Sequence, residues 1–257
     1  MPTPGLPAMT RRLLAEFLGT ALLVAVVVGS GIAAQQLSPG DGGLQLLENS
    51  TATMLGLTVL ILMFGPVSGA HFNPVVSLAD WCLGRRTGHG LTLTEVGWYA
   101  VAQVAGAVAG AVLANVMFGV RTSISTTDRV TPGHLVAEVV ATTFLVALIF
   151  ALVRSGRGGL AAPAVGAYIG AAYWFTSSTS FANPAVTVGR IFSDTFAGIG
   201  PGSAAAFAVM QFVGLVVGLV VTVALYPGAG DHADDAVVPH LGRSDRTPTA
   251  DAPERTA

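Results

Sequence analysis

Two Asn-Pro pairs, Asn73-Pro74 and Asn183-Pro184, are the residues of this chain best placed to do chemistry. Asparagine is among the best helix N-caps, and proline is favoured at the first helical position because its missing N–H would be unpaired there anyway. The segments Asn73-Pro74-Val75 and Asn183-Pro184-Ala185 therefore each predict the start of a helix, with the asparagine amide left as a donor toward a passing oxygen. Each helix N-terminus carries roughly half a positive charge. A single Asn-Pro is usually a turn, but two such ends facing each other would repel cations and protons and let neutral solutes pass.

Glu16 and Glu138 are carboxylates inside otherwise apolar stretches. A carboxylate within a membrane span is a functional candidate by default, for example as part of a proton relay. His71 has no partner ligand at metal-binding spacing, and the single cysteine, Cys82, cannot form an intramolecular disulfide. No combination of nucleophile, base and metal ligands is apparent, so the sequence predicts no enzyme, no metal site and no cofactor.

The scarcity of charge indicates where the chain resides. Charged residues make up 10% of the 257 residues, hydrophobic residues make up 52%, and the net charge is −2. Soluble domains average about 25% charged residues, so an ordinary soluble enzyme is excluded. A nucleic-acid binder is excluded because the basic face that it needs is absent. We therefore expect a membrane protein whose surroundings are the lipid bilayer.

Six apolar stretches are long enough to cross a bilayer, which takes about 20 residues of helix. They lie at residues 13–34, 49–79, 96–120, 135–153, 158–189 and 195–230. Two of them, 49–79 and 158–189, are too long for one helix and too short for two, and both are interrupted by Pro and Gly in their second half. Each predicts a full span followed by a short re-entrant segment, which is tolerated at membrane depth only beside protein or a water-filled cavity.

The two halves of the chain repeat each other. Ala15-Glu16 corresponds to Ala137-Glu138, and the two Asn-Pro pairs correspond to each other. Gln103, Gly106 and Gly110 match Gln211, Gly214 and Gly218, and the glycines are interpreted as helix-packing contacts. Because each half has an odd number of spans, the second half must insert upside down, which brings the special segments together at the bilayer midplane.

The domain organisation follows from these spans. We expect an N-terminal segment at residues 1–11, a channel domain at 12–227 with inverted halves at about 12–120 and 134–227, and a disordered tail at 228–257. Arginines next to the spans fall mainly on one side, at residues 11–12, 85–86, 154–157 and in the tail. The positive-inside rule then predicts a multi-pass protein of the cell membrane with both termini in the cytoplasm.

At the Asn-Pro segments the chain resembles the major intrinsic protein family, the aquaporins and glycerol facilitators. Residues 68–75 match the first signature loop of that family, with Val75 in place of its usual alanine, and residues 181–185 match the second. The resemblance implies an all-α membrane fold with six tilted helices, two re-entrant half-helices and a homotetramer with one pore per subunit. It also implies that Glu16 and Glu138 accept hydrogen bonds from the loops before the half-helices, and that His71 braces a loop or lines the pore.

In that family four residues near the outer mouth form the selectivity filter. Alignment on the Asn-Pro pairs gives Thr53, Ala171, Ser180 and Val186, where the last position is normally arginine. The missing guanidinium predicts a wider and nearly uncharged filter. Arg190, one turn beyond Val186, could substitute for it; the alternative is an arginine at the outer mouth that pairs with Asp194.

These features predict a passive channel for small uncharged solutes. The segment around Asn183 is similar to bacterial family members associated with arsenic resistance, so the expected solutes are metalloid acids such as arsenous acid, glycerol-like polyols and water. Two alternatives remain open: a channel mainly for water, or a coupled secondary transporter, which would also use inverted repeats and broken helices. Of the ionisable residues that a transporter needs along its path, the predicted pore offers only His71.

Overall fold

The computed structural model describes residues 6–85 and 88–227, and these residues form helices joined by loops. Five of the helices are long and apolar enough to cross a membrane. They are α1 (Ala8–Leu37), α2 (Gly42–Ser68), α4 (Leu93–Met117), α5 (Pro132–Arg154) and α8 (Pro201–Leu225). The predicted tail at 228–257 lies outside the described residues.

The sixth expected span is α6 (Ala161–Phe175), which is shorter than the other five. Its 15 residues are about 22 Å long at a rise of 1.5 Å per residue. The 3₁₀ turn η1 (Gly158–Leu160) directly precedes α6 and lengthens this segment. The described part of the chain therefore contains five helices of spanning length, and α6 lies at the position of the sixth expected span.

Two short helices begin at the prolines of the Asn-Pro pairs, as predicted. They are α3 (Pro74–Gly84) and α7 (Pro184–Gly189), and α7 continues into the 3₁₀ turn η2 (Arg190–Phe192). At 11 and 6 residues neither helix can cross a hydrocarbon core about 30 Å thick. They are the two half-helices that the sequence predicts.

The end of α2 differs from the prediction. Pro66 was expected to interrupt the span, but α2 continues through it to Ser68. The helix ends at Gly69, whose φ of 87° lies in the left-handed region that glycine adopts without strain. A proline near a helix end removes only one backbone hydrogen bond, so glycine and not proline sets this boundary.

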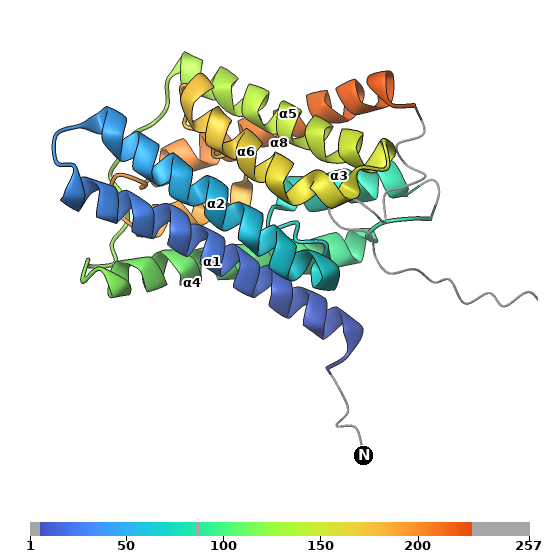
Figure 1. Ribbon diagram of the computed structural model, residues 1–257, viewed down its shortest axis with the longest axis horizontal. Helices are drawn as coiled ribbons and strands as arrows, with labels where there is room; N and C mark the ends of the chain where they lie inside the picture. The colour runs from blue at the N-terminus through green and yellow to red at the C-terminus, as the bar shows by residue number, and fades with distance from the viewer. Residues whose placement is uncertain (1–5, 86–87, 228–257) are drawn as a thin grey trace, which may run out of the picture.

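The helices pack as two similar halves. In the first half α1 contacts both α2 and α4, and in the second α5 contacts both α6 and α8. Each half-helix also contacts the last long helix of the other half, α3 with α8 and α7 with α4. Figure 1 shows the long helices running side by side along a common direction, with α1, α2 and α4 in one group and α5, α6 and α8 in the other. The half-helices therefore join the two groups.

Small residues allow the long helices to approach closely. A Cβ atom added at Gly106 of α4 would lie 2.3 Å from the carbonyl oxygen of Phe17 in α1. One added at Gly110 would lie 2.0 Å from the carbonyl oxygen of Ala21, also in α1. In α8 a Cβ at Gly214 would lie 2.7 Å from Thr142 of α5. The backbones of α1 and α4 thus touch at positions where no other residue fits, in agreement with the packing role predicted for these glycines.

The outer surface of the subunit is apolar as well. Large hydrophobic side chains are exposed along the long helices, among them Leu55, Val59 and Leu62 of α2 and Val216 and Val220 of α8. Exposed apolar faces of this extent are unfavourable in water and suit contact with lipid or with other subunits.

Candidate functional site

The centre of the molecule is the place where the N-termini of α3 and α7 meet. The side chain of Asn73 caps α3, because its Oδ1 accepts a hydrogen bond from the backbone N–H of Val75 at 3.0 Å. The Oδ1 of Asn183 caps α7 by accepting from the N–H groups of Ala185 at 2.9 Å and Val186 at 3.2 Å. The prolines that follow the two asparagines occupy the first helical positions. This is the capping geometry that the two sequence pairs predict.

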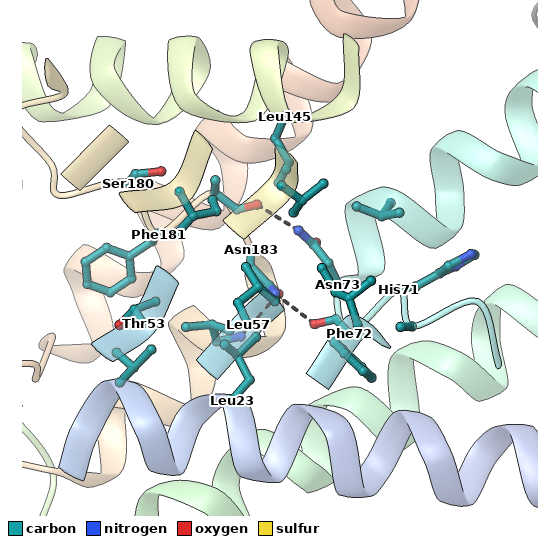
Figure 2. Close-up of a pocket in the computed structure, with 18 of the residues that line it drawn as sticks. Leu23, Thr53, Leu57, His71, Phe72, Asn73, Leu145, Ser180, Phe181 and Asn183 are labelled. Carbon is teal, nitrogen blue, oxygen red and sulfur yellow. Dashed lines mark hydrogen bonds between the residues drawn. The ribbon is translucent and has the colours of Figure 1, made fainter. Parts of the chain in front are cut away.

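The two asparagines also join the halves to each other. The Nδ2 of Asn73 donates to the carbonyl oxygen of Ala182, and the Nδ2 of Asn183 donates to that of Phe72, both at 2.8 Å. Figure 2 shows these two hydrogen bonds as dashed lines crossing between the loops. Since an amide NH₂ has two hydrogens, each asparagine keeps one N–H that can donate to a molecule beside it.

Glu16 holds the loop before α3. Its Oε1 accepts from the Ser68 hydroxyl at 2.6 Å and the His71 N–H at 3.0 Å, and its Oε2 accepts from the Phe72 N–H and the Gln103 amide, both at 2.7 Å. The side chain is fully buried. A buried carboxylate is stable only when its oxygens are hydrogen-bonded. All of these donors are neutral, and three of the four belong to the loop before α3 or to the end of α2.

Glu138 repeats this arrangement in the second half. Its Oε1 accepts from the Ser178 hydroxyl at 2.6 Å and the Phe181 N–H at 3.0 Å. Its Oε2 accepts from the Ala182 N–H at 2.9 Å and the Gln211 amide at 2.6 Å. All four of these hydrogen-bond donors belong to the protein, as they do for Glu16.

The two loops that the glutamates hold have an unusual backbone. Among residues 6–85 and 88–227, five residues other than glycine adopt a positive φ, and all lie within four residues of Asn73 or Asn183: Ala70, Phe72, Thr179, Ser180 and Ala182. Such conformations cost about 1–3 kcal/mol each and persist where the surroundings hold them. The hydrogen bonds to Glu16 and Glu138 hold these conformations, so the two loops can run along the cavity without forming helix or sheet.

A cavity of about 60 Å³ passes the two asparagines. This volume is well below that of pockets for drug-sized ligands, which enclose several hundred Å³, so it suits small molecules. The apolar part of the lining includes Leu23, Leu57, Ile61, Leu145, Val165 and Ile169. The loop residues 70–73 and 180–183 form the polar part of the lining.

His71 lies near one end of the cavity and the filter residues lie near the other. In Figure 2 His71 is on one side of the two asparagines, and Thr53, Ser180 and Phe181 are on the other. The ring Nδ1 of His71 is 3.0 Å from the Ser77 hydroxyl, and the ring packs against Tyr99 at 5.5 Å between centroids. His71 is therefore held by its neighbours and also lines the cavity.

Three of the four predicted filter residues lie beside the cavity, and the fourth does not. Thr53, Ser180 and Val186 line the cavity, but Ala171 is exposed on the subunit and does not. Tyr173, two residues further along α6, lines it instead, and its hydroxyl lies 3.3 Å from that of Thr53. Two residues turn a helix by about 200°, so counting back from Asn183 selected the wrong face of α6.

Arg190 also lines the cavity, so a guanidinium lies beside it one turn beyond Val186. Its guanidinium lies over the ring of Phe181, 3.5 Å from the centroid, and its Nε donates to the carbonyl of Ala197. The sequence left open whether this arginine serves the pore or pairs with Asp194. Asp194 instead accepts from the N–H of Thr126 at 2.9 Å, and this hydrogen bond lowers the pKa of the Asp194 carboxyl.

The described residues contain no group of three or more His, Cys, Asp or Glu side chains that could hold a metal ion. The site has instead a narrow cavity, two helix N-termini at its midpoint, and donors from amides, hydroxyls and one guanidinium. Such an arrangement can select molecules by size, hydrogen bonding and charge, and it makes or breaks no bond.

Comparisons with known proteins agree with this geometry. Residues 6–181 match the family model described as Major intrinsic protein. Aquaglyceroporin AqpS of Rhizobium meliloti (strain 1021) is 48% identical over 213 residues, which cover 82% of this chain and 88% of that protein. The glycerol uptake facilitator protein of Pseudomonas aeruginosa is 40% identical over 101 residues, 39% of this chain and 33% of that protein. The X-ray structure of the aquaglyceroporin from Plasmodium falciparum shares the fold, with a TM-score of 0.55 and 21% identity over 89% of this chain and 96% of that one.

Proposed function

This chain belongs to the major intrinsic protein family, and we propose that it is a passive channel through which small polyols and metalloid hydroxides cross the membrane. Members of the family are multi-pass membrane channels for water and small solutes such as glycerol, and they are not enzymes. The observation that carries the proposal is the meeting of two asparagine-capped helix N-termini inside one continuous cavity.

The electrostatics of this meeting point favour uncharged solutes. Each half-helix directs its positive end toward the midpoint of the cavity, where the low dielectric of the surroundings strengthens the repulsion of cations. An uncharged solute meets no such barrier. A hydroxylated solute can accept hydrogen bonds from the remaining amide hydrogens of Asn73 and Asn183 while its carbon side passes the apolar part of the lining.

Glycerol and arsenous acid are the solutes that we propose. Both are uncharged at neutral pH, and both carry three hydroxyls on a compact centre. Along the cavity the hydroxyls of Thr53 and Ser180 and the two asparagine amides offer partners in succession. Two relatives are named as an aquaglyceroporin and a glycerol uptake facilitator, which supports a solute larger than water. The runner-up is a channel mainly for water.

A coupled transporter is disfavoured by the ionisable groups along the path. Among the residues that line the cavity, these are His71, Tyr173 and Arg190. Glu16 and Glu138, the carboxylates nearest the pore loops, already accept four hydrogen bonds each from the protein. A proton-coupled carrier needs a carboxylate that exchanges its hydrogen-bond partners during the cycle. The partners of these two carboxylates are all fixed groups of the protein.

The assembly and orientation that we propose are those predicted from the sequence. A homotetramer in the cell membrane would cover part of the exposed apolar surface of α2 and α8, and lipid would cover the rest. Both termini would lie in the cytoplasm, as the arginine bias indicates.

The experiment that tests the solute assignment is stopped-flow uptake of water, glycerol, urea and arsenous acid by liposomes that contain the purified protein. Empty liposomes give the background for each solute. We expect glycerol and arsenous acid permeabilities at least several times this background. Water flux alone above background would replace the assignment with the runner-up, and no flux of any solute would refute the channel.

A further inference from the structure

Arg190 is a buried cation inside the proposed pore. Its side chain is 2% exposed, yet it lines the cavity together with Val186, which lies one helical turn earlier. The desolvation of a guanidinium is costly unless fixed partners hold it. The first question is therefore what holds this one.

Two contacts fix the guanidinium of Arg190. Its Nε donates to the carbonyl of Ala197 in the loop after η2, and its face lies on the ring of Phe181. Phe181 is held in turn by an edge-to-face contact with Phe207 of α8, 5.3 Å between centroids. A cation on an aromatic face is stabilised by the ring quadrupole, so the arginine is kept in place without a carboxylate.

The end of the guanidinium remains available. Within residues 6–85 and 88–227, neither terminal nitrogen of Arg190 has a hydrogen bond or an ion pair. The hydroxyl of Ser180, which also lines the cavity and is 3% exposed, has no hydrogen-bond partner in the same part of the chain. A buried polar group without a protein partner normally has another one, such as water or a ligand.

Arg129 provides a comparison close by. Its guanidinium also faces the Phe181 ring, at 5.5 Å, but it donates to the carbonyls of Gly198 and Phe196 and does not line the cavity. The two arginines therefore differ in their contacts: Arg129 donates to carbonyls of the loop after η2, whereas the terminal nitrogens of Arg190 can donate into the cavity.

We propose that Arg190 determines the charge selectivity of this pore, supplying from one turn after Val186 the positive barrier that excludes cations at the filter. Its terminal nitrogens and the Ser180 hydroxyl form the polar side of the constriction, and Tyr173 and Val186 complete it. The inference rests on the proposed channel function and names the residue that sets its specificity.

The test is the cation leak of reconstituted variants. Liposomes with an entrapped pH-sensitive dye are prepared with the wild type, Arg190→Met, Arg190→Gln and Arg190→Lys, and proton entry is followed under a fixed gradient. Arg121→Met is the matched control, because Arg121 is exposed between α4 and α5 and lies outside the cavity lining. The amount of protein recovered in the liposome membrane shows whether each variant is inserted, and each leak is divided by that amount.

We expect Arg190→Met to raise the proton leak per inserted protein about tenfold over both the wild type and Arg121→Met. Arg190→Lys keeps the charge and should stay within about twofold of the wild type. Should Arg190→Met fail to insert, Arg190→Gln, whose amide can still donate to Ala197, carries the same expectation. A leak in Arg190→Met and Arg190→Gln no larger than that of Arg121→Met would overturn the proposal, and so would a leak in Arg190→Lys as large as that of Arg190→Met. The channel function itself is tested on the wild type alone: a wild-type protein that carries neither water nor solute would refute the channel, whatever leak the Arg190 variants show.

Discussion

At the scale of single residues, two carboxylates hold the pore loops. Glu16 and Glu138 each bind two backbone N–H groups of the segment before a half-helix, one hydroxyl and one glutamine amide. The N–H groups that they satisfy belong to residues with or next to a positive φ. The glutamates therefore fix a strained backbone in the conformation that brings Asn73 and Asn183 together.

Replacing Glu16 with glutamine should destabilise the protein. The NH₂ group of the new glutamine can only donate, so it cannot accept the two hydrogen bonds that one oxygen of Glu16 now accepts. Buried donors would be left unpaired, at a cost of about 2–4 kcal/mol. The measurement is the thermal unfolding midpoint in detergent, which we expect to fall by about 5 °C or more.

The control is Glu95→Gln. Glu95 accepts a hydrogen bond from the N–H of Thr92, the N-cap of α4, and pairs with Arg12 at 3.4 Å near the surface, so this change should cost about 1 kcal/mol or less. Equal midpoints for the two variants would show that Glu16 does not brace the loop.

Val186→Arg tests the filter itself. Val186 lines the cavity one turn before Arg190, so a second guanidinium there would narrow the constriction and add a like charge. Stopped-flow uptake should show glycerol flux reduced about tenfold and water flux reduced less. Val186→Leu, which adds bulk without charge, should show a smaller loss. Unchanged glycerol flux in Val186→Arg would mean that the filter lies elsewhere.

The residues that the sequence predicted well are those whose role depends on local chemistry. The capping of α3 and α7 by Asn73 and Asn183 follows from the Asn-Pro pairs alone. Ala171 was misplaced because its assignment depended on which side of α6 faces the cavity, and a spacing along the chain does not show that. The place of Arg190 was left open because the ring of Phe181 and the carbonyl of Ala197 that hold it come together only in the fold.

At the scale of elements, close helix contacts set the geometry of the halves. The contact of α1 with α4 depends on Gly106 and Gly110, where the backbone of α1 leaves no room for a side chain. In a membrane such contacts replace the hydrophobic effect as the source of helix association. The matching glycines of α8 lie against α5; the sequence predicts helix packing at these glycines but not the partner helix.

Gly110→Ala should weaken the contact between α1 and α4. The added Cβ would lie 2.0 Å from the Ala21 carbonyl oxygen, and overpacking of this kind costs about 1–3 kcal/mol. Thermal unfolding in detergent should show a lower midpoint. Gly97→Ala on the same helix meets no atom within 4 Å and should leave the midpoint unchanged or raise it. A Gly110→Ala midpoint equal to that of Gly97→Ala would contradict the close contact.

Two features of the elements could not be predicted from apolar runs. α2 continues through Pro66, since a proline in the last turn of a helix removes little hydrogen bonding. α6 has only 15 residues, because the 3₁₀ turn η1 forms the start of a segment that hydropathy alone treats as continuous.

At the scale of the whole molecule, two similar halves enclose one path. The half-helices hold the halves together, since each packs against a long helix of the other half and their asparagines exchange hydrogen bonds across the centre. A carrier with inverted repeats must move one half against the other. Here such a movement would break the hydrogen bonds at the midpoint, which favours a fixed pore.

The most direct test of a fixed pore is the dependence of glycerol flux on its gradient. Glycerol uptake by liposomes that contain the wild-type protein is measured over a wide range of external glycerol concentrations, with and without an imposed proton gradient. A passive channel predicts an initial flux that rises in proportion to the glycerol gradient and is unaffected by the proton gradient. A flux that saturates and collapses when the proton gradient is removed would contradict the channel and establish a coupled transporter.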